Sequence, residues 1–275
     1  MAKPTVFVTR NIPTPGVALV REFCDVFLHG GEAPPSREEL IQKVKDKDAL
    51  ICLLTDRIDK DVIGAGKNLK VISTMSVGFE HIDVLEATKN GIYVGYTPDV
   101  LTDATADLTF TLLLCSARRI VEADSYVRRG DWKIPWSPTL FIGEDVWGRT
   151  IGIIGLGRIG KAVAKRAKGF DMRILYTGRR RSTPSQEDEL GAEYRSLEDL
   201  LKESDFVTLH VPLTKETYHM INENNLRLMK PTARLINTSR GATIDEKALI
   251  RALDEKWTNQ QLVYHYLEQE GIYVE

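Results

Sequence analysis

The sequence predicts an α/β protein built from two doubly wound parallel sheets. Short β-branched runs alternate with amphipathic stretches along almost the whole chain, which is typical of strands and helices in βαβ units. A glycine-rich turn, Gly155 to Gly160, stands between a buried apolar run and an amphipathic one. The 275 residues, 43% of them apolar, are enough for two domains.

The first sheet is predicted from five short apolar runs, and a helix start lies between the second and the third. Ser36 precedes Glu39 by three residues, a capping box in which each side chain satisfies a backbone N–H of the first helical turn. The predicted strands are Thr5–Thr9, Asp25–His29, Ala49–Leu53, Lys70–Thr74 and Ile92–Gly95.

A domain boundary is expected directly after the fifth strand. Pro98 biases Thr97 away from helical angles, so the chain can change direction there. We therefore assign residues 1–98 to one domain and residues 99–275 to a second. A long helix is predicted to open the second domain, from about Thr102 to about Arg119.

Residues 130–148 have no clear periodicity and contain Trp132, Trp136 and Trp147 among prolines and glycines. We interpret this segment as an ordered arm. Aromatic side chains carry much of the binding energy of protein interfaces, so the arm could anchor a partner subunit. The alternative is that the arm packs on its own domain.

Composition excludes several classes of protein. The 37 basic and 39 acidic residues leave a net charge of −2, which gives no electrostatic footprint for nucleic acid. The N-terminal residues lack an apolar segment with a cleavage site, and the apolar run at 110–117 is far below the ~20 residues that span a bilayer. Cys24, Cys52 and Cys115 are odd in number and far apart, which favours reduced thiols over disulfides or a zinc site. We expect a cytoplasmic protein with no metal, no membrane and no nucleic acid partner.

The glycine-rich turn carries the most information about function. It follows a predicted strand, Arg149–Ile154, and the next strand is predicted at Met172–Thr177. Gly155 permits a tight turn, Gly157 lets the backbone approach a pyrophosphate, and Gly160 lets the helix close onto the strand. Glycine turns also occur in sheets that bind nothing, but the strand-turn-helix context favours a dinucleotide site.

The end of the second strand of this unit bears on the choice of cofactor. A carboxylate usually stands there to bind the ribose hydroxyls of NAD, whereas this chain has Gly178 followed by Arg179, Arg180 and Arg181. A guanidinium group can bind a 2′-phosphate that an acid would repel. The sequence therefore favours NADPH, with NADH also possible, and the alternative is a solvated basic loop.

Further strands are predicted at Asp205–Val211 and Ala233–Asn237. Thr238-Ser239-Arg240-Gly241 follows the second of them, at the strand end that faces the ligand crevice in open α/β sheets. Arg240 is placed there to hold a carboxylate, although a surface arginine in a turn is the alternative.

Four segments together resemble the D-2-hydroxyacid dehydrogenases, and within them the glyoxylate reductase/hydroxypyruvate reductase branch. The similarity covers roughly residues 5–255 and is carried by MSVGFEHID, TPDVLTDATADL, IGIIGLGRIGKAVAKR with ILYTGRR, and LINTSRG. The resemblance implies a flavodoxin-like substrate domain and a Rossmann nucleotide-binding domain. It also implies hydride transfer to a small 2-oxo acid such as glyoxylate or hydroxypyruvate, and a homodimer formed through the nucleotide domain.

The resemblance also implies roles for individual residues. Val77 and Gly78 would offer backbone N–H groups to the substrate carboxylate. Arg240 would bind the same carboxylate, polarise the neighbouring ketone and so be the catalytic residue. The cofactor would be bound by Gly155, Gly157, Arg158, Ile159, Gly160, Arg179, Arg180, Arg181, Ser182, Pro212 and Thr238.

After Leu253 the sequence departs from the family pattern, which continues with a strand, a catalytic glutamate, a strand ending in a catalytic histidine, and a helix that returns to the substrate domain. This chain reads TNQQLVYHYLEQEGIYVE instead, so neither the glutamate nor the histidine has a matching residue. His265 and His81 are the candidates for a substitute acid, but His265 lacks a strand-then-turn context and we interpret His81, although better placed, as structural. We interpret His210 as a strand-end residue near the nucleotide and infer no catalytic role for it.

Two consequences are expected from this departure. Activity should be severely reduced, because general acid–base assistance is typically worth ~10²–10⁴ in rate. A nucleotide-binding protein without catalysis, or a nonfunctional product of a truncated or frameshifted gene, is the alternative. The Rossmann sheet should lack its last strands, which leaves the edge of the Ala233–Asn237 strand unpaired. The tail could cover this edge in part, because it shows weak signals for a short helix at Leu262, Val263, Tyr266 and Leu267 and for a strand at Ile272–Val274.

Overall fold

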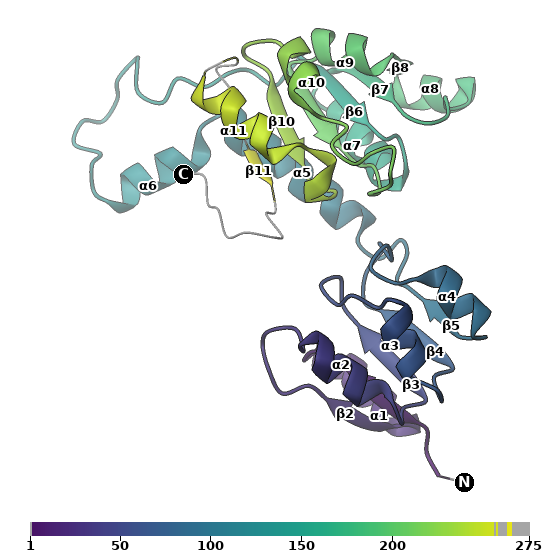
Figure 1. Cartoon of the computed structure of the whole chain (residues 1–275). Helices are drawn as coiled ribbons and strands as arrows, with labels where there is room; N and C mark the ends of the chain where they lie inside the picture. Colours follow the sequence, from purple (N-terminus) through teal and green to yellow (C-terminus); the bar gives the residue numbers. More distant parts are fainter. Residues whose placement is uncertain (1, 256, 258–262, 266–275) are drawn as a thin grey trace. The chain divides into compact units, whose positions relative to one another are not determined.

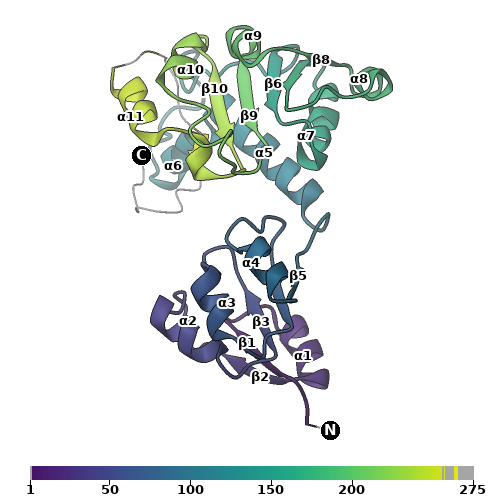
Figure 2. The same ribbon diagram turned by 45° about the vertical axis from the view of Figure 1, so that its right-hand side comes forward.

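The computed structural model describes residues 2–255, 257 and 263–265 of the chain. It divides the chain into two compact units, Met1–Val100 and Leu101–Glu275, each with its own parallel sheet (Figures 1 and 2). Asp99, just before the division, has a φ of 70°, a left-handed conformation that turns the chain locally. No helix among the described residues has the length and apolar character that crossing a bilayer requires.

The first unit is a five-stranded parallel sheet in the order β2-β1-β3-β4-β5, with helices on both faces. Its main core lies between the sheet and α2, α3 and α4, where Leu50, Val62 and Ile72 are fully buried. The elements are β1 (Thr5–Val8), α1 (Thr14–Phe23), β2 (Asp25–Leu28), α2 (Arg37–Val44), β3 (Ala49–Cys52), α3 (Lys60–Ala65), β4 (Val71–Thr74), α4 (Val84–Lys89) and β5 (Tyr93–Gly95). All five predicted strands are confirmed, and Ser36 caps α2 by accepting a hydrogen bond from the Glu39 N–H at 3.2 Å.

The second unit is a six-stranded parallel sheet in the order β11-β10-β9-β6-β7-β8. The elements are α5 (Thr102–Ala117), α6 (Ile120–Arg128), β6 (Thr150–Ile154), α7 (Arg158–Lys168), β7 (Arg173–Thr177), α8 (Pro184–Leu190), β8 (Ala192–Tyr194), α9 (Leu197–Glu203), β9 (Phe206–Leu209), α10 (Glu223–Leu228), β10 (Arg234–Asn237), a 3₁₀ turn (Gly241–Thr243), α11 (Glu246–Asp254) and β11 (Val263–His265). Strand order reverses between β6 and β9, the position where doubly wound sheets bind their ligands.

Both faces of this sheet are covered, which is why its strands are almost uniformly apolar. On one face Ile151 and Ile153 of β6 pack with α5 and α7, where Leu113 and Val163 are fully buried. On the other face the strands pack with α9, α10 and α11. The sequence alternation therefore becomes two hydrophobic layers that hold the loops at the carboxyl ends of the strands.

The structure corrects two expectations at the edges of this sheet. The edge of β10 is not unpaired, because β11 lies parallel to it with Ile236 opposite Val263. Val263 therefore belongs to a strand, not to a helical stripe, since an open edge of backbone N–H and C=O groups gains most from an extended partner. β8, only three residues long, was not identified from the sequence. The strand expected at 272–274 lies outside the described residues.

The segment after α5 forms the predicted arm. Arg119, with a φ of 53°, separates α5 from α6, and none of the residues of α6 is buried. Figure 1 shows α6 and the residues that follow it reaching away from the sheet. Trp132, Trp136 and Trp147 are 57%, 75% and 70% exposed, so the arm packs little of its aromatic surface on its own unit.

Candidate nucleotide and carboxylate site

The turn between β6 and α7 has the geometry that a dinucleotide elbow requires. Gly155 has a φ of +99°, and a Cβ atom there would lie 2.8 Å from the backbone oxygen of His210. A Cβ at Gly160 would lie 2.2 Å from the backbone oxygen of Gly155. A Cβ at Gly157, by contrast, would meet no atom within 4 Å. Gly155 and Gly160 therefore allow the close packing of the turn, while Gly157 borders open space.

That open space lies where an anion is best accommodated. α7 begins at Arg158, directly after Gly157, and no side chain caps it. The N–H groups of a first helical turn and the helix dipole favour negative charge. Ile159 packs its side chain on the core, so only its backbone faces the turn, whereas Arg158 is exposed. The residues present thus fit the pyrophosphate of a dinucleotide.

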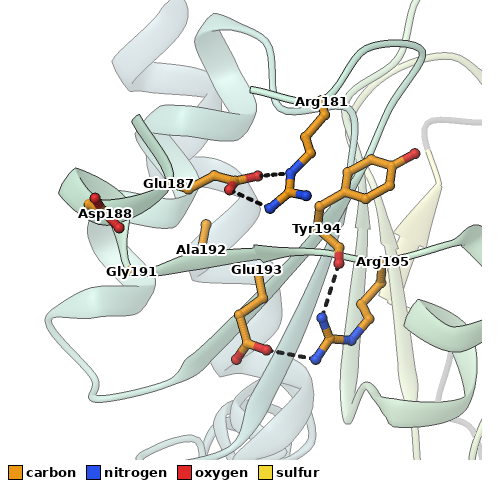
Figure 3. A pocket seen from close by; sticks show the side chains of 8 residues that line it. All are labelled: Arg181, Glu187, Asp188, Gly191, Ala192, Glu193, Tyr194 and Arg195. Atoms are coloured by element: carbon orange, nitrogen blue, oxygen red, sulfur yellow. Dashed lines mark hydrogen bonds and ion pairs between the residues drawn. The ribbon is translucent and has the colours of Figure 1, made fainter. Parts of the chain in front are cut away.

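The arginine loop that follows β7 is partly tied to α8. Glu187 of α8 accepts hydrogen bonds from Nε and Nη2 of Arg181 at 2.9 and 2.8 Å (Figure 3). The buried Tyr176 donates its hydroxyl proton to the same carboxylate at 2.5 Å and accepts a hydrogen bond from the Ser182 N–H at 2.9 Å. These bonds hold the Glu187 carboxyl pKa at about 2, while burial raises the pKa of Tyr176.

Arg179 and Arg180 differ from Arg181. Both are exposed, and within the described part of the chain neither forms a hydrogen bond or a close ion pair. Arg179 acts at longer range on Glu216, whose carboxyl pKa is lowered mainly by a hydrogen bond from Thr214. Arg179 and Arg180 are therefore available to a ligand, whereas Arg181 is paired with Glu187.

Arg240 lies in a turn that the buried Asn237 side chain organises. The Asn237 amide donates to the Arg240 carbonyl at 2.9 Å, and its carbonyl oxygen accepts from the N–H of Ser239 at 2.9 Å. The Thr243 hydroxyl donates to the Arg240 carbonyl at 2.6 Å. Thr238 shares a hydrogen bond of 2.8 Å with Thr109 of α5. The backbone of Arg240 is thus held from two sides at the carboxyl end of β10.

His210 and Pro212 follow β9, beside the glycine turn. Burial lowers the pKa of His210 to about 4, and its Nε2 atom is buried with no hydrogen-bond partner among the described residues. The imidazole is therefore neutral at physiological pH. Pro212 is exposed, and its carbonyl accepts a hydrogen bond from the Thr217 hydroxyl at 2.6 Å.

Val77 and Gly78 belong to the first unit, in the loop after β4. The Ser76 hydroxyl donates to the Gly78 carbonyl at 2.6 Å and shares a hydrogen bond of 2.8 Å with Thr74. Thr74 in turn lies 3.1 Å from Nε2 of His81. His81 therefore braces the loop from behind, in agreement with a structural role. Burial raises the pKa of the adjacent Cys52 thiol to about 12, so this thiol is not a nucleophile.

Sequence reasoning did not identify four side chains of this arrangement: Asn237, Tyr176, Glu187 and Ser76. Asn237 and Tyr176 are buried polar residues near the ends of apolar strands, a pattern that could have pointed to loop anchors. Glu187 and Ser76 carry no such signal, because only the fold shows which loop they contact.

Comparison with known proteins agrees with this geometry. Residues 110–265 match the NAD-binding domain of the D-isomer specific 2-hydroxyacid dehydrogenases. The chain is 55% identical to a glyoxylate reductase from Thermococcus onnurineus over 258 residues, which are 93% of this chain and 77% of the relative.

The chain is also similar to several solved structures. The TT0316 protein from Thermus thermophilus is 46% identical, with a TM-score of 0.84 over 91% of this chain and 78% of that one. A D-lactate dehydrogenase from Aquifex aeolicus, solved with NAD and lactic acid, is 30% identical, with a TM-score of 0.81 over 95% and 77%. The acyclic imino acid reductase Bsp5, solved with NADPH and D-Arg, is 29% identical, with a TM-score of 0.82 over 96% and 84%.

Proposed function

Because the chain belongs to the D-isomer specific 2-hydroxyacid dehydrogenases, we propose that it reduces glyoxylate or hydroxypyruvate and takes its hydride from NADPH. Membership makes it a nicotinamide-dependent dehydrogenase whose substrates are small 2-oxo and 2-hydroxy acids. The observation that carries the proposal is the open space at Gly157, beside the uncapped start of α7 and at the reversal of strand order.

The chemistry assigned to the chain's own residues is recognition and charge stabilisation. A bound nicotinamide would supply the hydride. The Arg240 guanidinium would hold the substrate carboxylate through charge-assisted hydrogen bonds and place positive charge beside the carbonyl oxygen. In the first unit, the N–H groups of Val77 and Gly78 are proposed as carboxylate ligands, as the family resemblance implies. The 1–98 and 99–275 segments would thus be substrate and nucleotide domains.

The preference for NADPH follows from the loop after β7. No carboxylate stands at Gly178 to bind ribose hydroxyls, and the exposed Arg179 and Arg180 can pair with a 2′-phosphate. We expect NADPH to bind at least about tenfold more tightly than NADH, measured by fluorescence titration of each dinucleotide. Equal affinities would contradict this assignment and favour a solvated basic loop.

Turnover by this chain is proposed to be slow. The family's histidine and its glutamate have no matching residues in the divergent segment after Leu253, and His81, the better-placed candidate for a substitute acid, braces the loop after β4. Cofactor binding without efficient reduction is therefore the second candidate function. NADPH titration followed by glyoxylate addition separates the two functions, because NADPH binds in both cases. Loss of NADPH absorbance at the rate of the related glyoxylate reductases would exclude the second.

The assembly is proposed to be a cytoplasmic homodimer formed through the second unit. The exposed tryptophans of the arm and the bare surface of α6 provide the apolar area that a subunit interface needs. The cytoplasmic assignment rests on free Cys24, Cys52 and Cys115, which suit a reducing compartment.

Arg240 provides the direct test of substrate recognition. Replacing it by lysine keeps the charge but removes the planar fork, so kcat/KM for glyoxylate should fall about 100-fold while NADPH affinity stays constant. Arg251→Lys is the matched control, because Arg251 lies on the surface and pairs with Glu223 at 2.8 Å. Equal activity of the two variants would disprove the assignment.

A further inference from the structure

The loop between β7 and α8 is anchored by one carboxylate and one phenol. Glu187 has a side chain only 11% exposed, although its partner Arg181 is 65% exposed. The Tyr176 hydroxyl connects two parts of this arrangement, since it donates to Glu187 and accepts from the Ser182 N–H. The loop is therefore tied to β7 and to α8 through a single polar centre.

Two tyrosine rings pack beside Arg181. The Arg181 guanidinium lies 5.9 Å from the centre of the Tyr194 ring, and Tyr194 packs edge-on against Tyr176 with centroids 5.4 Å apart. Figure 3 shows the Arg181 side chain directed toward Glu187, with Tyr194 beside it. Arg181, Glu187 and Tyr194 are among the residues that line a pocket of about 460 Å³. The bidentate pair and the ring contact both direct the Arg181 guanidinium toward Glu187.

We infer that Tyr176 and Glu187 form a latch that orders residues 178–183, with Arg181 as a positioning residue and Arg179 and Arg180 as the ligands of a 2′-phosphate. This inference rests on the proposed NADPH preference. It gives the three consecutive arginines different roles, which the sequence alone does not distinguish.

Tyr176→Phe tests the latch without changing charge. The Ser182 N–H and Glu187 lose their shared partner, so NADPH affinity should fall about threefold to tenfold. NADH affinity should stay within about twofold, because NADH lacks the 2′-phosphate. Tyr194→Phe is the matched control, since the Tyr194 hydroxyl forms no hydrogen bond within the described part of the chain. Equal NADPH affinity in the two phenylalanine variants would overturn the inference.

The role of Arg181 is tested by combining substitutions. If Arg181 acts through the latch, Arg181→Gln added to Tyr176→Phe should weaken NADPH binding by less than about twofold further, because the two residues share one network. If Arg181 were instead a direct ligand of the phosphate, the losses of NADPH affinity from the two substitutions would multiply. That result would overturn the positioning role.

Limited trypsin digestion gives a readout that does not depend on cofactor. Cleavage after Arg179 and Arg180 should be faster in Tyr176→Phe than in Tyr194→Phe, because the loop is released from β7. Equal cleavage rates would show that there is no latch. If the wild-type chain binds NADPH and NADH equally, the cofactor proposal and the phosphate assignment fail together, whereas cleavage still decides whether Tyr176 orders the loop.

Discussion

Gly157 and Gly160 stand three residues apart and differ in what surrounds them. A methyl group at Gly160 would lie 2.2 Å from the Gly155 oxygen, and neither backbone segment can move without disturbing the turn. Gly160→Ala should therefore lower the free energy of unfolding by about 2–4 kcal/mol. Gly157→Ala meets no protein atom within 4 Å and should leave stability within about 0.5 kcal/mol of wild type.

Substitutions at these two glycines distinguish an effect on folding from an effect on cofactor binding. Gly157→Ala should weaken NADPH binding at least about tenfold, because its methyl group enters the space proposed for the pyrophosphate. Urea unfolding and fluorescence titration measure the two effects. A Gly157→Ala variant with wild-type affinity would place the cofactor elsewhere.

His210 makes stability depend on pH in a defined window. Its folded-state pKa is about 4, below the unfolded value of ~6.5, so between these values the unfolded chain binds more protons. Its contribution is complete above pH ~6.5 and is lost as the pH falls toward 4. The free energy of unfolding should drop by about 2–3 kcal/mol across this window from His210 alone. His210→Gln should show a smaller drop in urea unfolding, and an identical pH profile would contradict the assignment.

The turn after β10 depends on one amide. The buried Asn237 side chain donates a hydrogen bond to the Arg240 carbonyl and accepts one from the Ser239 N–H, so its loss removes both bonds from the turn. Asn237→Ala should lower the free energy of unfolding by about 2–4 kcal/mol and reduce kcat/KM for glyoxylate. Asn222→Ala is a suitable comparison, because Asn222 caps the short helix α10 and its loss should cost about 1 kcal/mol. If both variants retain full activity, the turn does not position Arg240.

The arm gives a prediction for the whole molecule. The side chains of Trp136 and Ile142 are 75% and 64% exposed, and placing charges there should disrupt a subunit interface. Trp136→Glu combined with Ile142→Glu should shift the chain from dimer to monomer in sedimentation velocity. Leu19→Glu, at a similarly exposed apolar site on α1, should leave the association state unchanged. A dimer that persists in the arm variant would show that the interface lies elsewhere.

Most of the fold was accessible from local patterns. The strands of both units other than β8 and β11, the capping by Ser36, the long helix from Thr102 and the glycine turn depend on residues close together in the chain. The pairing of β11 with β10 was not accessible from local patterns, because the sequence there has only weak preference for helix or strand. The open edge of β10 selects the strand conformation of β11.

The sequence by itself determined two doubly wound sheets, the elbow at Gly155–Gly160, and the placement of Arg240 at a strand end, since periodicity and glycine spacing are local properties. Only the tertiary structure decided which arginine is occupied by Glu187, which asparagine holds the turn of Arg240, and that His210 is neutral. Those depend on burial and on contacts between elements distant in the chain, which no local pattern encodes.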